Sequence, residues 1–574
     1  MLAAVPVIAV TGASTAAAAT DFTEFRGVHW SRLGDNATFD PLVLQGMSAT
    51  DTYSSARSKA DAMFEAFQVG LDANTVRLPV NPATVNTSWW NTYKAVVDAA
   101  LARGFKVVLS YWTEDSGSKP PNMDSWNAMW DTLTNMYASN PLVYFSPQNE
   151  PWDGLQSWLD RAAKWISDRP EVPRNRIFLD GYRTVAEDYG SDLRPLCNDH
   201  RLDGTMLAFH LYGFQVAYAT EQEWKNKIKT YIGDCASRTV IEEFGAPADT
   251  GADYSDPNSP DKNVPYLRAM VSVARELGLG SIWCHVIGGR IISPDHDELN
   301  ILRLNSATSI LPLWVPNMSA IDQVRFAWGM GPSIPTAPTG PLTRIEAENA
   351  ALLGGARVEP HSNASNGQNV GWMLNTGDGT TFSNLYASNR LDIGYAATSA
   401  GTFSLYVNGD KTQEISFPAT GGWNGFAEKT VDVTIPAGAT VTLKRDAGDS
   451  AINLDYIEQP REAEYGVLLN GARAEVRSGN VNGMNVGYLL NTGAGVAFRD
   501  MPASSKLDIH YAAMSAGTFS LYVNGDKTQE ISFPATGGWN DFAEKTVDVT
   551  IPAGATVTLK RDAGDSAINL DYIA

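Results

Sequence analysis

Residues 21–330 alternate between short apolar runs and longer stretches in which apolar residues recur every three or four positions. A short apolar run bounded by turn residues is typical of a buried strand, and the longer spacing is typical of an amphipathic helix. Helical patterns lie between the apolar runs, for example at residues 56–67, 89–102, 126–137 and 266–277. The predicted strands are residues 25–30, 75–80, 105–111, 142–146, 176–179, 206–212, 239–244 and 281–286.

Eight strands separated by helices over residues 21–330 predict a (β/α)8 TIM barrel. A doubly wound parallel sheet is the alternative. It is disfavoured because no glycine-rich phosphate-binding loop follows the first strand.

The pattern changes after residue 342. Apolar and polar residues now alternate between Gly, Pro and Asn turns, as in an antiparallel β-sandwich. The segment is also a repeat, because residues 399–457 recur at 515–573 with Gly425 changed to Asp541. We therefore predict two β-sandwich (jelly-roll) domains, at 343–458 and 459–574, joined to the barrel by a Pro-rich linker at 331–342.

The first twenty residues resemble a secretory signal. An apolar run at 2–10 precedes a stretch of small residues at 11–20, with Ala17-x-Ala19 as a plausible cleavage site. We therefore expect a secreted, extracellular protein. No segment has the roughly 18 consecutive apolar residues that span a bilayer.

The net charge of the chain excludes some classes of binding partner. With 43 basic and 64 acidic residues, the chain carries a net charge of -21, which disfavours nucleic acid and anionic membranes as partners. We expect a monomer.

Cys197 and Cys235 each precede a predicted strand; if these strands are parallel neighbours, the two thiols lie at the same end of the sheet and can form a disulfide. Cys284 lies in an apolar strand and is expected to be a buried free thiol.

The carboxyl ends of barrel strands form the active site in this fold. Two carboxylates, Glu150 and Glu243, follow the fourth and seventh predicted strands, and such a pair is what cleavage of a glycosidic bond requires. Ion-paired structural glutamates are the alternative, but the polar and aromatic neighbours favour catalysis. The other residues at these ends are His29, Trp30, Arg77, Tyr111, Trp112, Asn149, His210, Tyr212, Glu242 and Trp283.

The ordered set of these motifs resembles the retaining β-glycanases of glycoside hydrolase family 5, which have a clan A barrel. The motifs are Phe25-Arg-Gly-Val28, Arg77-Leu-Pro79, Asn149-Glu150-Pro151, His210-x-Tyr212, Glu243-Phe-Gly245 and Trp283. The resemblance implies that Glu150 is the acid/base and Glu243 the nucleophile, with no cofactor for catalysis. It also implies substrate-binding or orienting roles for Arg77, Asn149, His210 and Tyr212, and places Trp283 on the floor of the −1 subsite.

Three points depart from that pattern or leave it open. Where the family often has a histidine, this chain reads Ser110-Tyr-Trp-Thr-Glu114, so we expect His29 and Trp112 to contact the substrate instead. Glu114 and the next residue are either loop ligands or, as we favour, solvated. Side chains alternate along a strand, so only one of Glu242 and Glu243 points inward; the family pattern favours Glu243 and leaves Glu242 to pair with a basic group.

The repeated sandwiches resemble carbohydrate-binding modules of families 35 and 6, on their Glu-Ala-Glu openings and Asn-Leu-Asp endings. By this resemblance each module holds a structural Ca²⁺ through three carboxylates, for which three surface carboxylates are the alternative. The metal ligands would be Glu346, Glu348 and Asp455 in the first module and Glu462, Glu464 and Asp571 in the second. The sugar-binding residues would be Trp372, Trp423 and Asn453, and Tyr488, Trp539 and Asn569.

These observations predict a secreted retaining glycoside hydrolase that cleaves β-glycosidic bonds in a polysaccharide and is targeted by two binding modules. β-1,4-Glucan, β-mannan, β-1,3-glucan and xylan all remain open as substrates. The alternatives are an exo-acting β-glycosidase or transglycosylase acting on oligosaccharides, and a non-catalytic carbohydrate-binding protein.

Overall fold

A computed structural model describes residues 24–574, apart from 35, 116–118, 184–189, 214–217, 290, 294–295, 298, 305–312, 331–343, 366, 386–387, 437–438 and 481–482. The signal-like segment and the Pro-rich linker therefore lie outside the described residues. No helix in the described part of the chain is both long and apolar enough to cross a membrane.

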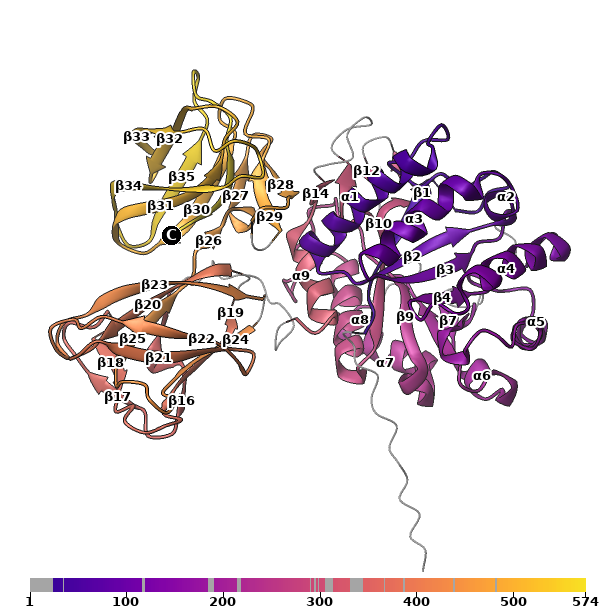
Figure 1. Ribbon diagram of the computed structural model, residues 1–574, viewed down its shortest axis with the longest axis horizontal. Helices are drawn as coiled ribbons and strands as arrows, with labels where there is room; N and C mark the ends of the chain where they lie inside the picture. Colours follow the sequence, from indigo (N-terminus) through magenta and orange to yellow (C-terminus); the bar gives the residue numbers. More distant parts are fainter. Residues whose placement is uncertain are drawn as a thin grey trace, which may run out of the picture.

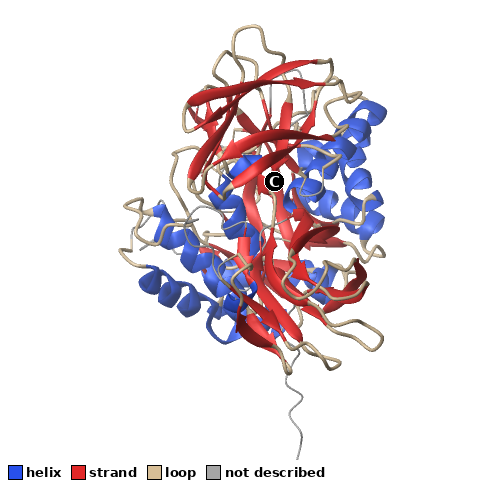
Figure 2. Ribbon diagram, turned by 90° about the vertical axis from the view of Figure 1, so that its left-hand side faces the viewer, coloured by secondary structure: helices blue, strands red, loops and turns tan. Residues whose placement is uncertain are grey.

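The first domain is a parallel barrel, as predicted. Its strands follow the order β4-β3-β2-β1-β10-β9-β8-β5, and a parallel bridge from Phe145 to Ile177 brings the two edge strands together. The strands are β1 (Arg26–Leu33), β2 (Thr75–Val80), β3 (Lys106–Tyr111), β4 (Val143–Ser146), β5 (Phe178–Asp180), β8 (Met206–His210), β9 (Thr239–Phe244) and β10 (Gly280–Gly289). Figure 2 shows helices outside these strands.

Helices separate the barrel strands along the chain (Figure 1). Capping fixes several of them; α7 begins after Thr220, whose hydroxyl and the Glu223 carboxylate cap each other's backbone N–H groups. The long helices are α1 (Tyr53–Leu71), α3 (Trp90–Ala102), α4 (Met123–Tyr137), α5 (Leu155–Asp168), α7 (Glu221–Ile232), α8 (Asn263–Leu277) and α9 (Met318–Ala327). Shorter ones are α2 (Pro82–Val85), α6 (Arg194–Cys197) and the 3₁₀ turns Arg174–Arg176, His200–Leu202 and Gly233–Arg238.

An apolar cluster separates the polar active site from the amino-terminal end of the barrel. Phe25 packs edge-on against Tyr144 and Phe178, with Val108 and Ile282 in the same buried cluster. Short hairpin strands lie in the segments that follow β5 and β10. They are β6 (Tyr182–Arg183), β7 (Ser191–Asp192), β11 (Ile291–Ser293), β12 (His296–Asp297), β13 (Arg303–Leu304) and β14 (Leu313–Trp314).

The remaining two domains are antiparallel sandwiches with separate apolar cores, as predicted. The first module contains β15 (Arg344–Glu346), a 3₁₀ turn (Ala347–Asn349), β16 (Ala351–Leu353), β17 (Arg357–Pro360), β18 (Gln368–Gly371), β19 (Gly379–Leu385), β20 (Ser388–Ala396), β21 (Gly401–Val407), β22 (Asp410–Phe417), β23 (Ala427–Ile435), β24 (Ala439–Lys444) and β25 (Asn453–Glu458). The second contains β26 (Arg461–Glu462), a 3₁₀ turn (Ala463–Tyr465), β27 (Val467–Leu469), β28 (Arg473–Val476), β29 (Met484–Gly487), β30 (Gly495–Met501), β31 (Ser504–Ala512), β32 (Gly517–Val523), β33 (Asp526–Phe533), β34 (Ala543–Ile551), β35 (Ala555–Lys560) and β36 (Asn569–Ile573).

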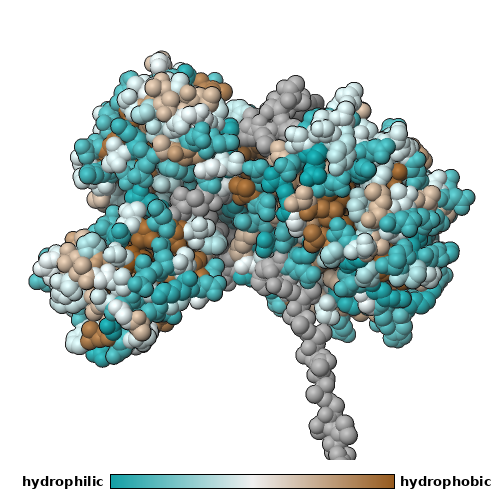
Figure 3. Space-filling view, in the orientation of Figure 1, coloured by the Kyte–Doolittle hydropathy of each residue, from teal (hydrophilic) through white to brown (hydrophobic). Residues whose placement is uncertain are grey.

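In the part of the chain that the structure describes, the second module and not the first forms a sheet with the barrel domain. Strand β14 pairs with β28, so one eight-stranded sheet runs from the barrel into the second sandwich (Figure 1). Hydrophilic residues cover most of the face shown in Figure 3, as expected for so acidic a chain.

Cys197 and Cys235 form a disulfide, as predicted, with their Cα atoms 6.1 Å apart. They precede the neighbouring parallel strands β8 and β9, which explains how the two thiols meet. Cys284 is free and buried, also as predicted.

We expect this disulfide to stabilise the barrel. Closing a loop across 38 residues contributes about 4 kcal/mol in the chain-entropy model. The double variant Cys197→Ser/Cys235→Ser should therefore melt at a lower temperature than the native protein in calorimetry. Reduction with dithiothreitol should lower the native melting temperature and leave the variant unchanged; equal melting of both proteins before reduction would contradict the assignment.

Candidate active site

The guanidinium of Arg77 lies at the centre of the polar end of the barrel and is fully buried. It forms ion pairs with Glu243 through Nη1 and with Glu242 through Nε, the latter at 3.1 Å. Its Nη2 donates to Ser110 Oγ at 2.9 Å and to Asn149 Oδ1 at 2.8 Å. Burial alone would lower the pKa of Arg77, but the two glutamates raise it above its usual value. One cation thus joins four neighbouring side chains.

Glu243 ends β9 and is held at both carboxylate oxygens. Arg77 pairs with Oε1, and the Tyr212 hydroxyl donates to Oε2 at 2.9 Å. Since its side chain is 5% exposed, these two contacts replace most of its hydration. Glu242 pairs with the same guanidinium and lies 3.3 Å from His210 Nε2, at a register shift between β8 and β9. Its pairing with a basic group is as predicted, but the expectation that only one of the two glutamates points inward was wrong.

Glu150 follows β4 and approaches the same region from the other side. Its φ of 40° lies in the left-handed region, and its backbone N–H donates to Asp180 Oδ2 at 2.8 Å. Its carboxylate lies 3.4 Å from His210 Nδ1 and 3.5 Å from Arg183 Nη1. Burial raises the pKa of Glu150, but the hydrogen bond and charge of His210 and the charge of Arg183 outweigh it, so the pKa is lowered.

His210 ends β8 and is surrounded by carboxylates. Its Nδ1 lies 3.4 Å from Glu150 and 3.6 Å from Glu243, and its Nε2 lies 3.3 Å from Glu242 and 3.5 Å from Asp180. Burial lowers the pKa of His210, but Glu243 and Asp180 raise it well above its usual value. Burial and the charge of Glu242 likewise raise the pKa of Asp180. In the substrate-free site the imidazole is therefore protonated beside an ionised Glu150.

Family comparisons agree with this geometry. Residues 35–285 match "Cellulase (glycosyl hydrolase family 5)", and residues 346–459 and 462–574 each match "Carbohydrate binding module (family 6)". The barrel is a family 5 glycosyl hydrolase domain. The two sandwiches that follow it are family 6 carbohydrate-binding modules.

The individual proteins compared with this chain share 29% sequence identity or less with it. The chain is 29% identical over 268 residues to a 1,6-alpha-glucosyltransferase of Sporosarcina globispora; the match covers 41% of this chain and about a fifth (21%) of that protein. A family 35 carbohydrate-binding module from Clostridium thermocellum is 29% identical, with a TM-score of 0.20, over 20% of this chain and 97% of its own. The catalytic domain of the major endoglucanase from Xanthomonas campestris pv. campestris is 19% identical, with a TM-score of 0.40, over 53% of this chain and 94% of its own.

Trp283 does not form the floor of a sugar subsite in the family 5 domain, contrary to the expectation from its motif. It is fully buried, packs edge-on against Phe244 and donates its indole N–H to Leu299 O at 3.0 Å. Trp112 is half-buried and lies over the Arg77 guanidinium, 4.4 Å from ring centroid to carbon. Trp112 therefore offers the aromatic surface that we had expected from Trp283.

His29 supports Trp112 and has no exposed surface of its own. Its ring lies 4.8 Å from the Trp112 ring, and its Nδ1 lies 3.2 Å from Cys284 Sγ. Burial and the charge of Arg77 lower the pKa of His29 well below its usual value, so the ring is neutral. Glu114 is also buried, and it accepts a hydrogen bond from the Tyr111 hydroxyl, so the preference for a solvated loop at this position was wrong.

Two residues near Glu150 were missed in the sequence. Asp180 was overlooked because the predicted fifth strand stopped at Leu179, one residue short of the observed end of β5. Trp152, two residues beyond Glu150, is 41% exposed and offers a second aromatic surface. Its position directly after the Asn-Glu-Pro motif was the available signal.

Clusters of potential metal ligands also occur in this domain. Among the described residues, three groups of His, Cys, Asp or Glu bring their ligand atoms within 4.8 Å of one another: His29–Cys284–His285, Glu150–His210–Glu243 and Asp180–His210–Glu242. In the latter two, His210 supplies the positive charge that a cation would otherwise provide. The predicted calcium ligands of the modules do not form groups this compact.

In the first module, two of the predicted sugar-binding residues, Trp372 and Asn453, lie close together, and the third, Trp423, lies in another loop. Trp372 is 52% exposed, and its indole N–H donates to Glu359. Asn453 lies against the same strand, because a Cβ on Gly371 would fall 2.9 Å from its Oδ1. Trp423, 38% exposed, belongs to the loop between β22 and β23.

The predicted calcium ligands differ between the modules. In the first, the Ser365 backbone N–H donates to Asp455 at 3.0 Å, and its hydroxyl donates to Glu346. In the second, Asp571 accepts from His510 Nδ1 at 2.7 Å and from Asn480 Nδ2 at 3.0 Å. Two protein side chains therefore already satisfy both carboxylate oxygens of Asp571.

The pH dependence of activity tests the charge balance around His210. In the native enzyme, the proton shared by Glu150 and His210 is lost only as pH rises through the raised pKa of His210. In His210→Gln, this proton can reside only on a carboxyl group, which loses it at lower pH. We expect the alkaline limb of the kcat/KM profile to move to lower pH. Tyr212→Phe, which removes a hydrogen bond but no charge near neutral pH, should lower activity without that displacement; equal displacement in both variants would contradict the prediction.

Proposed function

We propose that this protein is a secreted retaining glycoside hydrolase that cleaves β-glycosidic bonds in a polysaccharide by double displacement. Glu243 acts as the nucleophile and Glu150 as the acid/base. The signal-like segment and the Cys197–Cys235 disulfide support export, because disulfides persist in oxidising compartments.

The observation that carries the proposal is the closeness of the two carboxylates. Glu150 and Glu243 each place an oxygen within 4.8 Å of the other, and both lie beside the same nitrogen of His210, Nδ1. Retaining enzymes hold their carboxyl groups about 5–5.5 Å apart, whereas inverting enzymes need about 6.5–9.5 Å to admit a water molecule. The short separation favours direct attack by a carboxylate.

The contacts of each residue support its role. Glu243, held by Arg77 and Tyr212, is oriented to attack the anomeric carbon, while Glu150 gives its proton to the departing glycosidic oxygen. The covalent glycosyl ester is then hydrolysed by water whose proton returns to Glu150. Because Asn149 Oδ1 accepts from Arg77, its amide NH₂ is left to donate to a sugar hydroxyl.

The proton route in the first step depends on His210. In the free enzyme Glu150 is ionised and His210 is protonated, 3.4 Å away. A sugar bound beside Glu150 excludes water and disfavours its charged form, which draws the proton from the imidazolium to the carboxylate. His210 would thus hold the proton until the leaving group arrives.

A polymeric substrate follows from the modules and the exposed aromatic residues. The family name makes β-1,4-glucan the first substrate to test, and Trp112 and Trp152 offer surfaces for sugar rings on the two sides of the catalytic pair. The first module would bind the polymer through Trp372, Trp423 and Asn453.

We also propose a structural Ca²⁺ in the first module. Glu346 and Asp455 lie beside each other, because the Ser365 hydroxyl donates to Glu346 and lies 3.4 Å from Asp455 Oδ1. Burial and the nearby Glu348 also raise the pKa values of both carboxyl groups, so a cation would stabilise their charged forms. Oxygen ligands of this kind suit Ca²⁺.

The stereochemistry of the first product tests the mechanism. Proton NMR of the purified full-length enzyme with a soluble β-glucan oligosaccharide should show the β-anomer first, because two displacements retain configuration. Glu243→Gln should lower kcat by at least about 10⁴-fold and still bind substrate. Azide should restore turnover to Glu243→Gly with release of the α-glycosyl azide.

Glu276→Gln serves as the control. Glu276 is exposed and pairs with Lys229, far from Glu150 and Glu243 in the sequence, so this substitution should leave kcat unchanged. Release of the α-anomer first by the native enzyme would overturn the retaining assignment. Absence of turnover on the four candidate glycans would overturn the proposed substrate class.

A further inference from the structure

The two modules are near copies, yet they have different environments. Strand β14 of the barrel domain pairs with β28, with Leu313 opposite Val476 and Trp314 opposite Glu475. The Val315 N–H also donates to Ala474 O at 3.0 Å. The equivalent strand of the first module, β17, pairs on one side with β18, and its residues are mostly exposed.

Sequence differences between the copies lie at this contact. Ala474, Val476 and Met484 are at most 3% exposed and belong to the hydrophobic cluster of the barrel. At an offset of 116 residues the first module has Val358, Pro360 and Gln368, all exposed. Burial of apolar side chains stabilises a contact in proportion to the area removed from water. The β28–β29 hairpin of the second module therefore has the apolar residues expected of a buried surface, whereas the β17–β18 hairpin of the first module does not.

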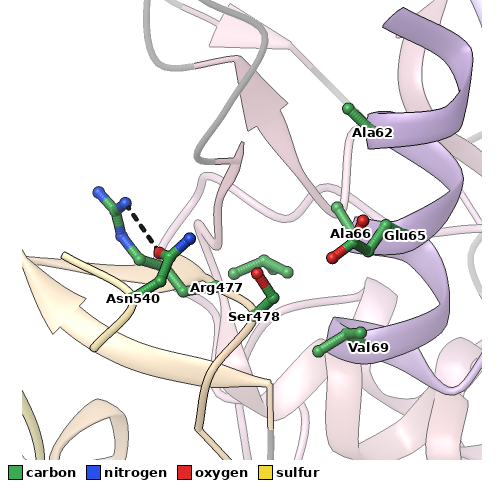
Figure 4. A pocket seen from close by; sticks show the side chains of 8 residues that line it. Ala62, Glu65, Ala66, Val69, Arg477, Ser478 and Asn540 are labelled. Atoms are coloured by element: carbon green, nitrogen blue, oxygen red, sulfur yellow. Dashed lines mark hydrogen bonds between the residues drawn. The ribbon is translucent and has the colours of Figure 1, made fainter. Parts of the chain in front are cut away.

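Helix α1 approaches the second hairpin closely because both sides have glycine at the contact. A Cβ on Gly70 would fall 2.7 Å from the Val476 methyl groups, and one on Gly483 would fall 2.2 Å from Val69 O. Closer to the start of α1, Ala62 and Ala66 face Ser478 across a crevice of about 110 Å³, where Arg477 contacts Asn540 (Figure 4).

Helix α9 supplies a polar contact to the same module. The Tyr465 hydroxyl donates to Asp322 at 3.0 Å, and burial raises the pKa of Asp322 to about 6. The equivalent residue in the first module is the exposed Asn349. The second module thus contacts α1, α9 and β14.

This contact uses the surface that corresponds to the sugar-binding surface of the first module. Arg473 lies between two rings, 5.0 Å from Trp314 and 5.0 Å from Tyr488. Glu475, equivalent to the Glu359 that contacts Trp372, is 1% exposed. This surface of the second module, where Tyr488 is half-buried, is therefore less open to a sugar than that of the first, where Trp372 is 52% exposed.

The surroundings of the predicted calcium ligand Asp571 also differ from those of Asp455 in the first module. The side chains that satisfy Asp571, His510 and Asn480, replace Gly394 and Ala364 of the first module. His510 is stacked on Tyr572, 4.6 Å between ring centroids, which fixes its position. In the first module the contacts of both Asp455 oxygens come from the Ser365 backbone N–H, whereas in the second the larger side chains of His510 and Asn480 occupy the space beside Asp571. The residues present therefore do not fit a second Ca²⁺ site, contrary to the expectation from the repeat.

We infer that the second module is docked on the barrel as a structural part of the catalytic unit, and that the first module alone binds polysaccharide and Ca²⁺. Its sheet partner β14 belongs to the segment that follows β10, at the carboxyl ends of the barrel strands. Trp314 stacks on Arg303, 5.3 Å from ring centroid to carbon, and Arg303 pairs with Asp249, six residues after Glu243. The docked module thereby contacts the segment that follows β10 and, through Arg303, the segment that follows β9, the strand of the nucleophile. The polysaccharide part of this inference rests on the proposed function.

The repeat provides matched pairs of variants in the full-length chain. Val476→Asp should lower both the melting temperature and kcat/KM on a soluble oligosaccharide, the latter by about tenfold or more, because it places a charge in the buried contact. Pro360→Asp, at the equivalent exposed position, should change neither. Met484→Gln introduces the residue of the first module and, if Val476→Asp does not fold, should still increase hydrogen exchange in the β14 segment.

Binding measurements separate the roles of the modules. Trp372→Ala should weaken binding to insoluble polysaccharide about tenfold or more, whereas Tyr488→Ala should change it by less than about twofold. Calorimetry with Ca²⁺ alone should give one site per chain, abolished by Asp455→Asn and unaffected by Asp571→Asn. Two Ca²⁺ sites, equal losses of polymer binding, or unchanged exchange and melting in both hairpin variants would overturn the inference.

These outcomes are distinguishable from failure of the proposed function. If no β-glycan is hydrolysed or bound, the proposed substrate is wrong. The melting, hydrogen-exchange and Ca²⁺ measurements still decide whether the second module is docked on the barrel as a structural part of the catalytic unit.

Discussion

The buried guanidinium of Arg77 is the constraint on which the active site depends. A cation without exposed surface is stable only where anions and oxygen acceptors surround it, and here Glu243, Glu242, Asn149 and Ser110 do so. The same contacts orient the nucleophile and the residue before the acid/base. The apolar cluster below Arg77 excludes water and makes these contacts strong. Truncating Arg77 would leave buried carboxylates without a counter-charge.

The charge of Arg77 is not sufficient for four carboxylates. His210 supplies a second positive charge, Arg183 lies 3.5 Å from Glu150, and the raised pKa of Asp180 favours its neutral form. The two nitrogens of His210 face Glu150 and Glu243 on one side and Glu242 and Asp180 on the other. The proton on the acid/base therefore belongs to a cluster and not to one residue. This modifies the simple view that burial alone keeps the acid protonated, because the neighbouring cations lower the pKa of Glu150.

Much of the fold and the catalytic pair could be predicted because strand periodicity and the order of motifs are local properties of the chain. Predictions failed where tertiary packing decides. Trp283 was expected to contact sugar, but its strand position could not show that its indole is covered; Asp180 was lost through an error of one residue at a strand end. A calcium site and a sugar site were expected in both modules because of the repeat, although the apolar residues Val476 and Met484 of the second copy were visible in the sequence.

The strength of each contact explains how near-identical modules can have unequal roles. The second module meets the barrel through buried apolar side chains and a shared sheet, which water and salt do not weaken. The first meets the second through Arg390, which pairs with Asp508 at 3.2 Å and with the 43%-exposed Glu544 at 2.8 Å. Ion pairs with an exposed partner contribute about 0–1 kcal/mol each and are screened by salt. Buried apolar contacts therefore join the second module to the barrel, whereas ion pairs of Arg390, one of them to an exposed partner, join the first module to the second.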